Sequence, residues 1–203
     1  MLVIGLTGGI AAGKSTAASL LRELGAAVID ADRLGHRVYE PGTRGFDRVV
    51  EDFGRDVVAG DGTIDRRALG DKVFGKPEAL KRLTDIVWPL IRELAAEEIE
   101  QLAAEDADRV IVLEAAVLLE ADWDDLVHEV WVVVVEPEIA IERLVSRDGM
   151  SRDDALARIR SQLSNRERLQ RSDRAIDNSA TPDELRGHLR LEWERLEQRT
   201  GKS

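Results

Sequence analysis

Hydrophobic residues along this chain fall either in short continuous runs or in longer stretches with helical spacing. The short runs are Leu2–Leu6, Ala26–Asp30, Val110–Leu113, Val130–Val135 and, more weakly, Arg174–Asp177. Continuous aliphatic runs of this length are typical of parallel strands that are covered on both faces. Because helical stretches separate the runs, the pattern predicts an α/β fold with a five-stranded parallel sheet flanked by helices.

Helical spacing is clearest in three stretches, which are Ser15–Leu24, about Pro77–Leu102, and Pro182–Arg199. Thr181 and Glu184 stand at the N-cap and third position of the last stretch, which is the spacing of a capping box. Its apolar residues recur every three or four positions and predict a helix that covers the sheet. These residues are Leu185, Leu189, Trp193 and Leu196.

A chain of 203 residues has the size of one domain, and it contains no repeat and no Pro-, Gly- or Ser-rich linker. We therefore expect a single domain over 1–203. With no cysteine, the chain has no disulfide, thiolate nucleophile or cysteine-ligated metal. Neither a signal peptide nor an apolar run of membrane length is visible, so we expect a cytoplasmic location and no membrane partner.

The formal net charge of -11 opposes broad contact with a nucleic acid backbone, and we expect no nucleic acid partner. The charge is uneven, however. Segment 143–174 holds nine arginines and five acidic residues, a local charge of +4, which indicates that something anionic binds there. The alternative is that these arginines form surface pairs with nearby acids.

The strongest motif is segment 8–15, which reads Gly-Gly-Ile-Ala-Ala-Gly-Lys-Ser and fits the P-loop pattern. Between a strand and a helix, such a loop directs backbone N–H groups and the helix dipole at a phosphate. Lys14 would bridge the β- and γ-phosphates, Ser15 would bind Mg²⁺, and Thr16 would reach the α-phosphate. The alternative is a glycine-rich turn without a ligand. We expect ATP to contact Gly8, Gly9, Ala11, Ala12, Gly13, Lys14, Ser15 and Thr16.

A P-loop alone does not separate kinases from GTPases, motor ATPases or nucleotide sensors. The guanine-reading Asn-Lys-x-Asp motif is absent from the sequence. Asp30 and Asp32 end the second predicted strand, at the sheet edge that carries the P-loop. Since an aspartate can orient an acceptor hydroxyl and take its proton, Asp32 is the candidate general base. The alternative is that both aspartates only cap the following helix.

The arginine-rich segment 143–174 has the pattern of a lid made of a helix, a turn and a helix. Arg143 and Arg147 are four residues apart and share a helix face. Gly149 breaks this helix, and Ser151 resembles the cap of the next one. A closing lid would bring guanidinium groups onto the transferring phosphoryl group and exclude water. We favour Arg147 over Arg158 and Arg160 for this contact, with Arg143 also at the ATP site.

The sequence resembles the dephospho-CoA kinase family along nearly its whole length. The resemblance lies in Ile4–Gly9 leading into the P-loop, Val28–Asp32, Pro89–Arg92, Arg147–Ser151 and Ile176–Asn178. It implies that ATP, with Mg²⁺, phosphorylates the ribose 3'-hydroxyl of dephospho-CoA. By resemblance, Asp32 is the base, Arg147 belongs to the lid and Asn178 lies at the adenine of ATP. The helices within 33–108 would receive the CoA-like substrate, with Arg92 as a contact.

Four residues at three places in the chain depart from the family's usual pattern. Trp88 stands where bacterial members usually have histidine, Glu114 where many have aspartate, and Ala11-Ala12 where Gly-Ser is common. The loop change predicts reduced adaptability but retained binding. Some stretches, such as that around Trp88, look closer to the kinase domain of animal bifunctional CoA synthase.

Three functions remain open from the sequence alone. The first is a kinase for dephospho-CoA, and the second is a kinase for another small alcohol such as a nucleoside or a sugar. The third is a nucleotide-binding regulator that has lost turnover. Retention of Lys14, Asp32 and Arg147 favours a kinase over the regulator. The sequence does not give the oligomeric state.

Overall fold

The structure of the chain, a computed structural model, describes residues 1–201 and divides into two compact units. The sheet unit comprises Met1–Ile29 and the chain from Ile99 onward. The helical unit comprises Asp30–Glu98 and overlaps the segment 33–108 that the sequence predicts as helical. No helix among residues 1–201 is long and apolar enough to cross a membrane.

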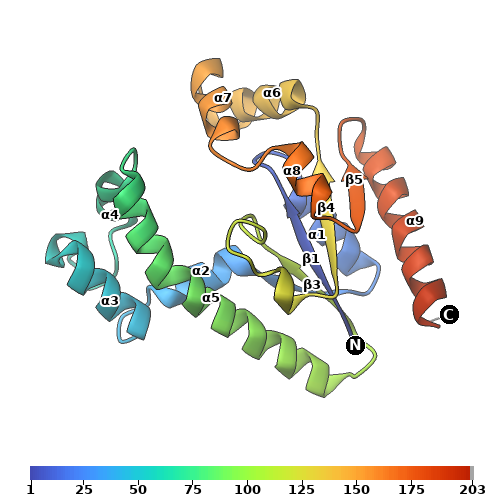
Figure 1. Cartoon of the computed structure of the whole chain (residues 1–203), viewed down its shortest axis with the longest axis horizontal. Coiled ribbons are helices and arrows are strands. Elements are labelled where there is room, and N and C mark those ends of the chain that lie inside the picture. The colour runs from blue at the N-terminus through green and yellow to red at the C-terminus, as the bar shows by residue number, and fades with distance from the viewer. Residues whose placement is uncertain (202–203) are drawn as a thin grey trace. The chain divides into compact units, whose positions relative to one another are not determined.

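The sheet unit is built on a five-stranded sheet with the order β2-β3-β1-β4-β5 (Figure 1). The strands pair in parallel, as in the register of Ile4 opposite Val112 and of Thr7 opposite Val132. The predicted five-stranded parallel α/β fold is confirmed, with strand ends moved by one or two residues. The strands are β1 (Leu2–Gly8), β2 (Ala27–Asp30), β3 (Val110–Glu114), β4 (Glu129–Val134) and β5 (Arg174–Asp177).

Helices cover this sheet because its central strands are apolar on both faces. Figure 1 shows α9 beside β5, and α6 and α7 side by side beyond the carboxyl end of β4. The helices are α1 (Lys14–Glu23), α6 (Pro137–Asp148), α7 (Arg152–Arg160), α8 (Asn165–Gln170) and α9 (Pro182–Thr200). A short 3-10 helix, η2 (Asp124–Leu126), lies in the connection from β3 to β4.

The C-terminal helix α9 forms as its sequence predicts. The Thr181 hydroxyl accepts a hydrogen bond from the Glu184 backbone N–H, and the Glu184 carboxylate accepts one from the Thr181 N–H. This capping box satisfies N–H groups that a helix start leaves without partners. The apolar face of α9 is buried in the core of the sheet unit, and its residues are Leu185, Leu189, Trp193 and Leu196.

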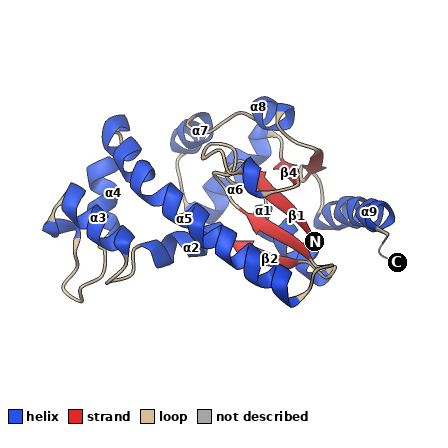
Figure 2. Cartoon of the chain, turned by 60° about the horizontal axis from the view of Figure 1, so that its bottom comes forward, coloured by secondary structure: helices blue, strands red, loops and turns tan. Residues whose placement is uncertain are grey.

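The helical unit begins at Asp30, whose carboxylate accepts hydrogen bonds from the backbone N–H groups of Asp32 and Arg33. Gly45 allows a close helix approach, because a Cβ there would lie 2.4 Å from the Val38 carbonyl oxygen. Figure 2 shows the unit as helices joined by loops. They are α2 (Ala31–Val38), α3 (Arg44–Phe53), the 3-10 helix η1 (Arg55–Val57), α4 (Arg66–Val73) and α5 (Pro77–Glu105), which continues into the sheet unit.

A buried ion pair fixes α8 to the segment that follows β3. The Arg168 side chain is 1% exposed, and its Nη2 lies 2.5 Å from a carboxylate oxygen of Glu120. The same guanidinium donates to the Leu163 carbonyl oxygen. Burial lowers the pKa of Arg168, and the Glu120 charge opposes that shift. The fully buried Arg168 charge therefore depends on the partly buried Glu120 carboxylate, because without it the guanidinium would lack a compensating charge.

Replacing Arg168 by leucine should lower the free energy of unfolding by about 3 kcal/mol, because the partly buried Glu120 carboxylate and the Leu163 carbonyl oxygen would lose their partner. For a chain of this size, the thermal midpoint should fall by roughly 6–12 °C. Thermal unfolding monitored by circular dichroism measures the change. Arg166→Leu on the same helix is the control, since Arg166 is exposed and forms no hydrogen bond or ion pair within residues 1–201. Equal midpoints for the two variants would contradict a stabilising pair.

Candidate active site

The P-loop lies between β1 and α1, as its sequence predicts. Gly13 is the N-cap of α1 and has φ 92°, in the left-handed region that favours glycine. A Cβ at Gly13 would also lie 2.1 Å from Asn178 Nδ2, so a side chain is excluded on steric grounds as well. The turn at Gly13 lets the loop end in a helix N-terminus, where backbone N–H groups and the helix dipole favour an anion.

Lys14 folds back over the loop that precedes it. Its Nζ donates hydrogen bonds to the carbonyl oxygens of Gly8, at 3.0 Å, and Gly9, at 3.2 Å. These two backbone carbonyl groups hold the ammonium group at the P-loop. A positive charge in this position attracts the phosphate oxygens of a nucleotide.

Ser15 is joined to a carboxylate at the end of the neighbouring strand. Its Oγ donates a hydrogen bond to Glu114 Oε1 over 3.0 Å. The parallel register places Glu114 opposite Leu6, so β1 and β3 end at the same edge of the sheet. From the sequence, Glu114 is a departure from the usual aspartate that could orient a Mg²⁺-bound water, but it is not among the predicted site residues. Its position at the end of the third predicted strand was the signal that could have found it.

A hydroxyl and a carboxylate oxygen are ligands that suit Mg²⁺, which prefers oxygen donors and keeps several waters. Ser15 and Glu114 therefore fit a magnesium ion bound together with nucleotide phosphates. The longer glutamate side chain still reaches the serine hydroxyl at hydrogen-bond distance.

A cavity of about 330 Å³ opens beside the P-loop and brings together six of the site residues that the sequence predicts, five for ATP binding and Arg147 for the lid. Its walls come from the P-loop, from α6, and from the start of α9 with the residue that follows β5. The six predicted residues are Ala11, Gly13, Thr16, Arg143, Arg147 and Asn178.

Arg143 and Asn178 bind the P-loop backbone. Arg143 Nη1 donates to the Ala11 carbonyl oxygen at 3.2 Å, and its Nη2 donates to the Asn178 carbonyl oxygen at 2.8 Å. The Asn178 side-chain amide donates to the Ala12 carbonyl oxygen at 2.7 Å. These bonds satisfy buried carbonyl groups and hold the loop in its shape. In this arrangement the two side chains form the wall of the cavity.

The lid helices form with the turn that the sequence predicts, Gly149 ending α6 at φ 65° and Ser151 capping α7. Arg147 is 66% exposed and makes two hydrogen bonds to the Asp148 carboxylate, at 2.7 and 2.9 Å. These bonds raise the pKa of Arg147 and lower that of Asp148. An exposed ion pair is weak, so the guanidinium can exchange Asp148 for a phosphate.

Some arginines of segment 143–174 form surface ion pairs with nearby acidic residues, which is the alternative to anion binding. Arg152 pairs with Glu138, and Arg171 pairs with Asp122 and Asp124 at 3.2 Å each. Their charge is therefore offset by neighbouring acids. The positive charge available to a ligand comes from a smaller set of arginines than the sequence count suggests.

Two predicted residues belong to the helical unit. Asp32 is exposed in the first turn of α2, where the side-chain caps come from Asp30. The capping alternative therefore holds for Asp30. Arg92 is partly buried on α5. The cavity beside the P-loop includes neither Asp32 nor Arg92.

Comparisons with known proteins identify the family. A family model described as dephospho-CoA kinase matches residues 2–184. A dephospho-CoA kinase of Symbiobacterium thermophilum is 45% identical over 193 residues, which cover 95% of this chain and 80% of the relative. Among solved structures, a protein from Thermus thermophilus is 35% identical, with TM-score 0.79 and coverage of 96% and 97% of the two chains. A dephospho-CoA kinase from Campylobacter jejuni is 26% identical, with TM-score 0.64 and 96% coverage of each chain. The sequence, the fold and the P-loop site agree with these matches, and the chain belongs to the dephospho-CoA kinase family.

Proposed function

We propose that this chain transfers the γ-phosphoryl group of ATP to the ribose 3'-hydroxyl of dephospho-CoA, giving CoA and ADP in the last step of coenzyme A synthesis. Membership of the dephospho-CoA kinase family over residues 2–184 carries the proposal. The P-loop with Lys14, and Ser15 bonded to Glu114, supplies the parts that phosphoryl transfer from ATP needs. We further propose a cytoplasmic enzyme without a nucleic acid partner, on the charge and apolar pattern of the sequence.

In this proposal the P-loop binds the β-phosphate through its backbone N–H groups and the N-terminus of α1. Lys14 neutralises charge on the β- and γ-phosphates from its position over Gly8 and Gly9. Ser15 and Glu114 would hold Mg²⁺ through their oxygen atoms. When bound, the ion neutralises charge that develops on the phosphate oxygens.

Asp32 accepts the proton of the 3'-hydroxyl as the oxygen forms its bond to the γ-phosphorus. The bond between that phosphorus and the oxygen of the β-phosphate breaks, and ADP leaves with the electron pair. Arg147 leaves Asp148 and binds the transferring group, which excludes water from it. Arg92 binds the CoA-like substrate. The exposed carboxylate of Asp32 and the exposed pair of Arg147 support these roles, since both are accessible to substrates.

Purified protein should release ADP from ATP and Mg²⁺ when dephospho-CoA is present, and mass spectrometry should detect CoA. Reactions without an acceptor and with adenosine are the controls. Turnover with adenosine but not with dephospho-CoA would contradict the proposal and show that the acceptor is another small alcohol. ATP binding without any turnover would favour a nucleotide-binding regulator.

Asp32→Asn should lower kcat by about 100-fold or more, because the general base is lost, while ATP affinity stays within about twofold. Steady-state kinetics and ATP titration calorimetry measure the two quantities. Asp71→Asn removes an exposed carboxylate from α4 of the same unit and should keep the activity of the unchanged enzyme. A kcat for Asp32→Asn close to that of Asp71→Asn would rule out Asp32 as the base.

Glu114→Gln should raise the Mg²⁺ concentration needed for half-maximal activity by about tenfold, because a neutral amide orients the ion and its waters less well. Activity measured across a Mg²⁺ titration at fixed ATP gives this value. Glu136→Gln, at the exposed N-cap of α6, controls for the lost charge. If both variants kept the Mg²⁺ dependence of the unchanged enzyme, Glu114 would have no part in holding the ion.

A further inference from the structure

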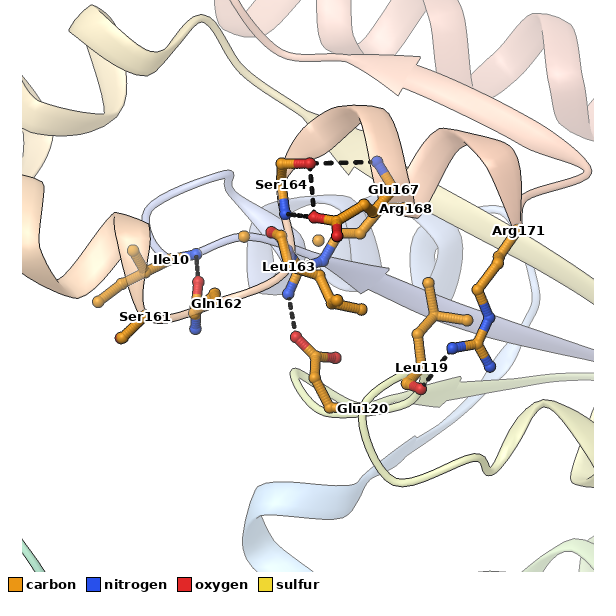
Figure 3. Close-up of polar contacts among 12 residues, drawn as sticks. Ile10, Leu119, Glu120, Ser161, Gln162, Leu163, Ser164, Glu167, Arg168 and Arg171 are labelled. Atoms are coloured by element: carbon orange, nitrogen blue, oxygen red, sulfur yellow. Dashed lines mark hydrogen bonds and ion pairs between the residues drawn. The ribbon is translucent and has the colours of Figure 1, made fainter. Parts of the chain in front are cut away.

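Gln162 joins the segment between α7 and α8 to the P-loop. We call this segment, together with the first residue of α8 (residues 161–165), the lid root. The Gln162 Oε1 accepts a hydrogen bond from the backbone N–H of Ile10 over 2.8 Å, as Figure 3 shows. Within residues 1–201, this is the hydrogen bond that links the lid root to the loop residues 8–13. The bond spans 152 positions in the sequence, so it is a tertiary contact.

The lid root is itself held by the body of the sheet unit. The buried Arg168 donates to the Leu163 carbonyl oxygen and pairs with the partly buried Glu120 (Figure 3). The Asn165 side chain donates to the Val135 carbonyl oxygen at 2.9 Å. Ser164 and Glu167 form a capping box that starts α8. Gln162 therefore reaches the P-loop from a segment whose neighbours have fixed positions.

The lid is thereby connected to adjacent P-loop residues from both of its ends. Arg143, in α6, donates to the carbonyl oxygen of Ala11. Gln162, which follows α7, accepts from the N–H of Ile10. The helix-turn-helix between these two contacts carries Arg147. Its position relative to the loop that would hold the phosphates depends on these two hydrogen bonds and on the packing of Ile10 and Ala11 against the apolar core of the lid helices.

A cavity of about 500 Å³ lies between the P-loop and the lid root, and Gln162 is part of its wall. Gly9 and Ile10 line the cavity from the loop, while Leu163 and Asn165 line it from the lid root. The loop and the lid helices pack through Ile10 and Ala11, and the Gln162 bond adds the hydrogen bond that joins the lid root to the loop beside this space. Water can enter such a space if the bond is lost.

We propose that Gln162 is a positioning residue, which holds the lid root against Ile10 so that the lid arginines meet the γ-phosphoryl group and exclude water. This inference rests on the proposed kinase function and deepens it. Gln162 does not need to touch the substrate. Its contribution is preorganisation, because misplacing a charged group by about 1 Å can cost much of the rate.

The test compares Gln162→Ala and Gln162→Asn with Gln170→Ala, which removes an exposed glutamine from α8. Alanine removes the acceptor, and asparagine is one methylene too short to reach Ile10. Both Gln162 variants should lower kcat by about 3- to 10-fold, the effect of losing one neutral hydrogen bond. The KM for dephospho-CoA should stay within about twofold, and the thermal midpoint should match that of Gln170→Ala.

The deciding measurement is the ratio of ADP formed to CoA formed, which does not depend on the fraction of active protein. The unchanged enzyme and Gln170→Ala should give a ratio near one. Both Gln162 variants should exceed one, because a loosened lid admits water to the phosphoryl group. Ratios near one for every variant would overturn the proposal, and so would a loss of rate explained by a lowered thermal midpoint.

Hydrogen–deuterium exchange separates this inference from the proposed function. The amide of Ile10 should exchange faster in Gln162→Ala than in Gln170→Ala, because it loses its acceptor. If the unchanged enzyme formed no CoA, the proposed kinase function would be wrong. Faster exchange at Ile10 in Gln162→Ala would still show that Gln162 holds the loop. Equal exchange at Ile10 in both variants would overturn the inference, even in an enzyme that makes CoA.

Discussion

The left-handed turn at Gly13 is the constraint on which the nucleotide site depends. It lets a chain leaving β1 close a loop and enter α1 within a few residues, with Asn178 too close for any side chain. Because the loop is this tight, its carbonyl oxygens face outward to Arg143 and Asn178. The P-loop, α6 and the residue after β5 thus meet at this turn, and Lys14 is the next residue in the chain after Gly13.

Much of the fold could be predicted because its signals are local. The aliphatic runs that became strands, and the caps at Asp30, Ser151 and Thr181, each depend on residues within a few positions of one another. The P-loop has the same character, since its glycines, lysine and serine adjoin a strand and a helix. Strand order follows less directly from sequence, because it depends on which apolar faces meet in space.

Contacts between distant segments could not be predicted in this way. A glutamine that follows an arginine-rich polar helix, as Gln162 does, has the pattern of a solvated surface, and nothing local indicates its bond to Ile10. In the sequence, Arg168 is likewise one more arginine of a basic segment, whereas in the structure it is buried and paired with Glu120. Buried ions and side chains bonded to distant backbone depend on the tertiary structure, which single-sequence patterns do not contain.

Ala11 shows how these long-range contacts act on the loop. It has φ 58°, a left-handed conformation that costs a residue with a Cβ roughly 1 kcal/mol or more. The strain persists because Arg143 binds the Ala11 carbonyl, while Gln162 holds the N–H of the preceding Ile10. A glycine would adopt this conformation without such support, but it would also leave the loop freer to move. The lid contacts therefore allow alanine in a position where the family commonly has glycine, and they couple the shape of the loop to the position of the lid.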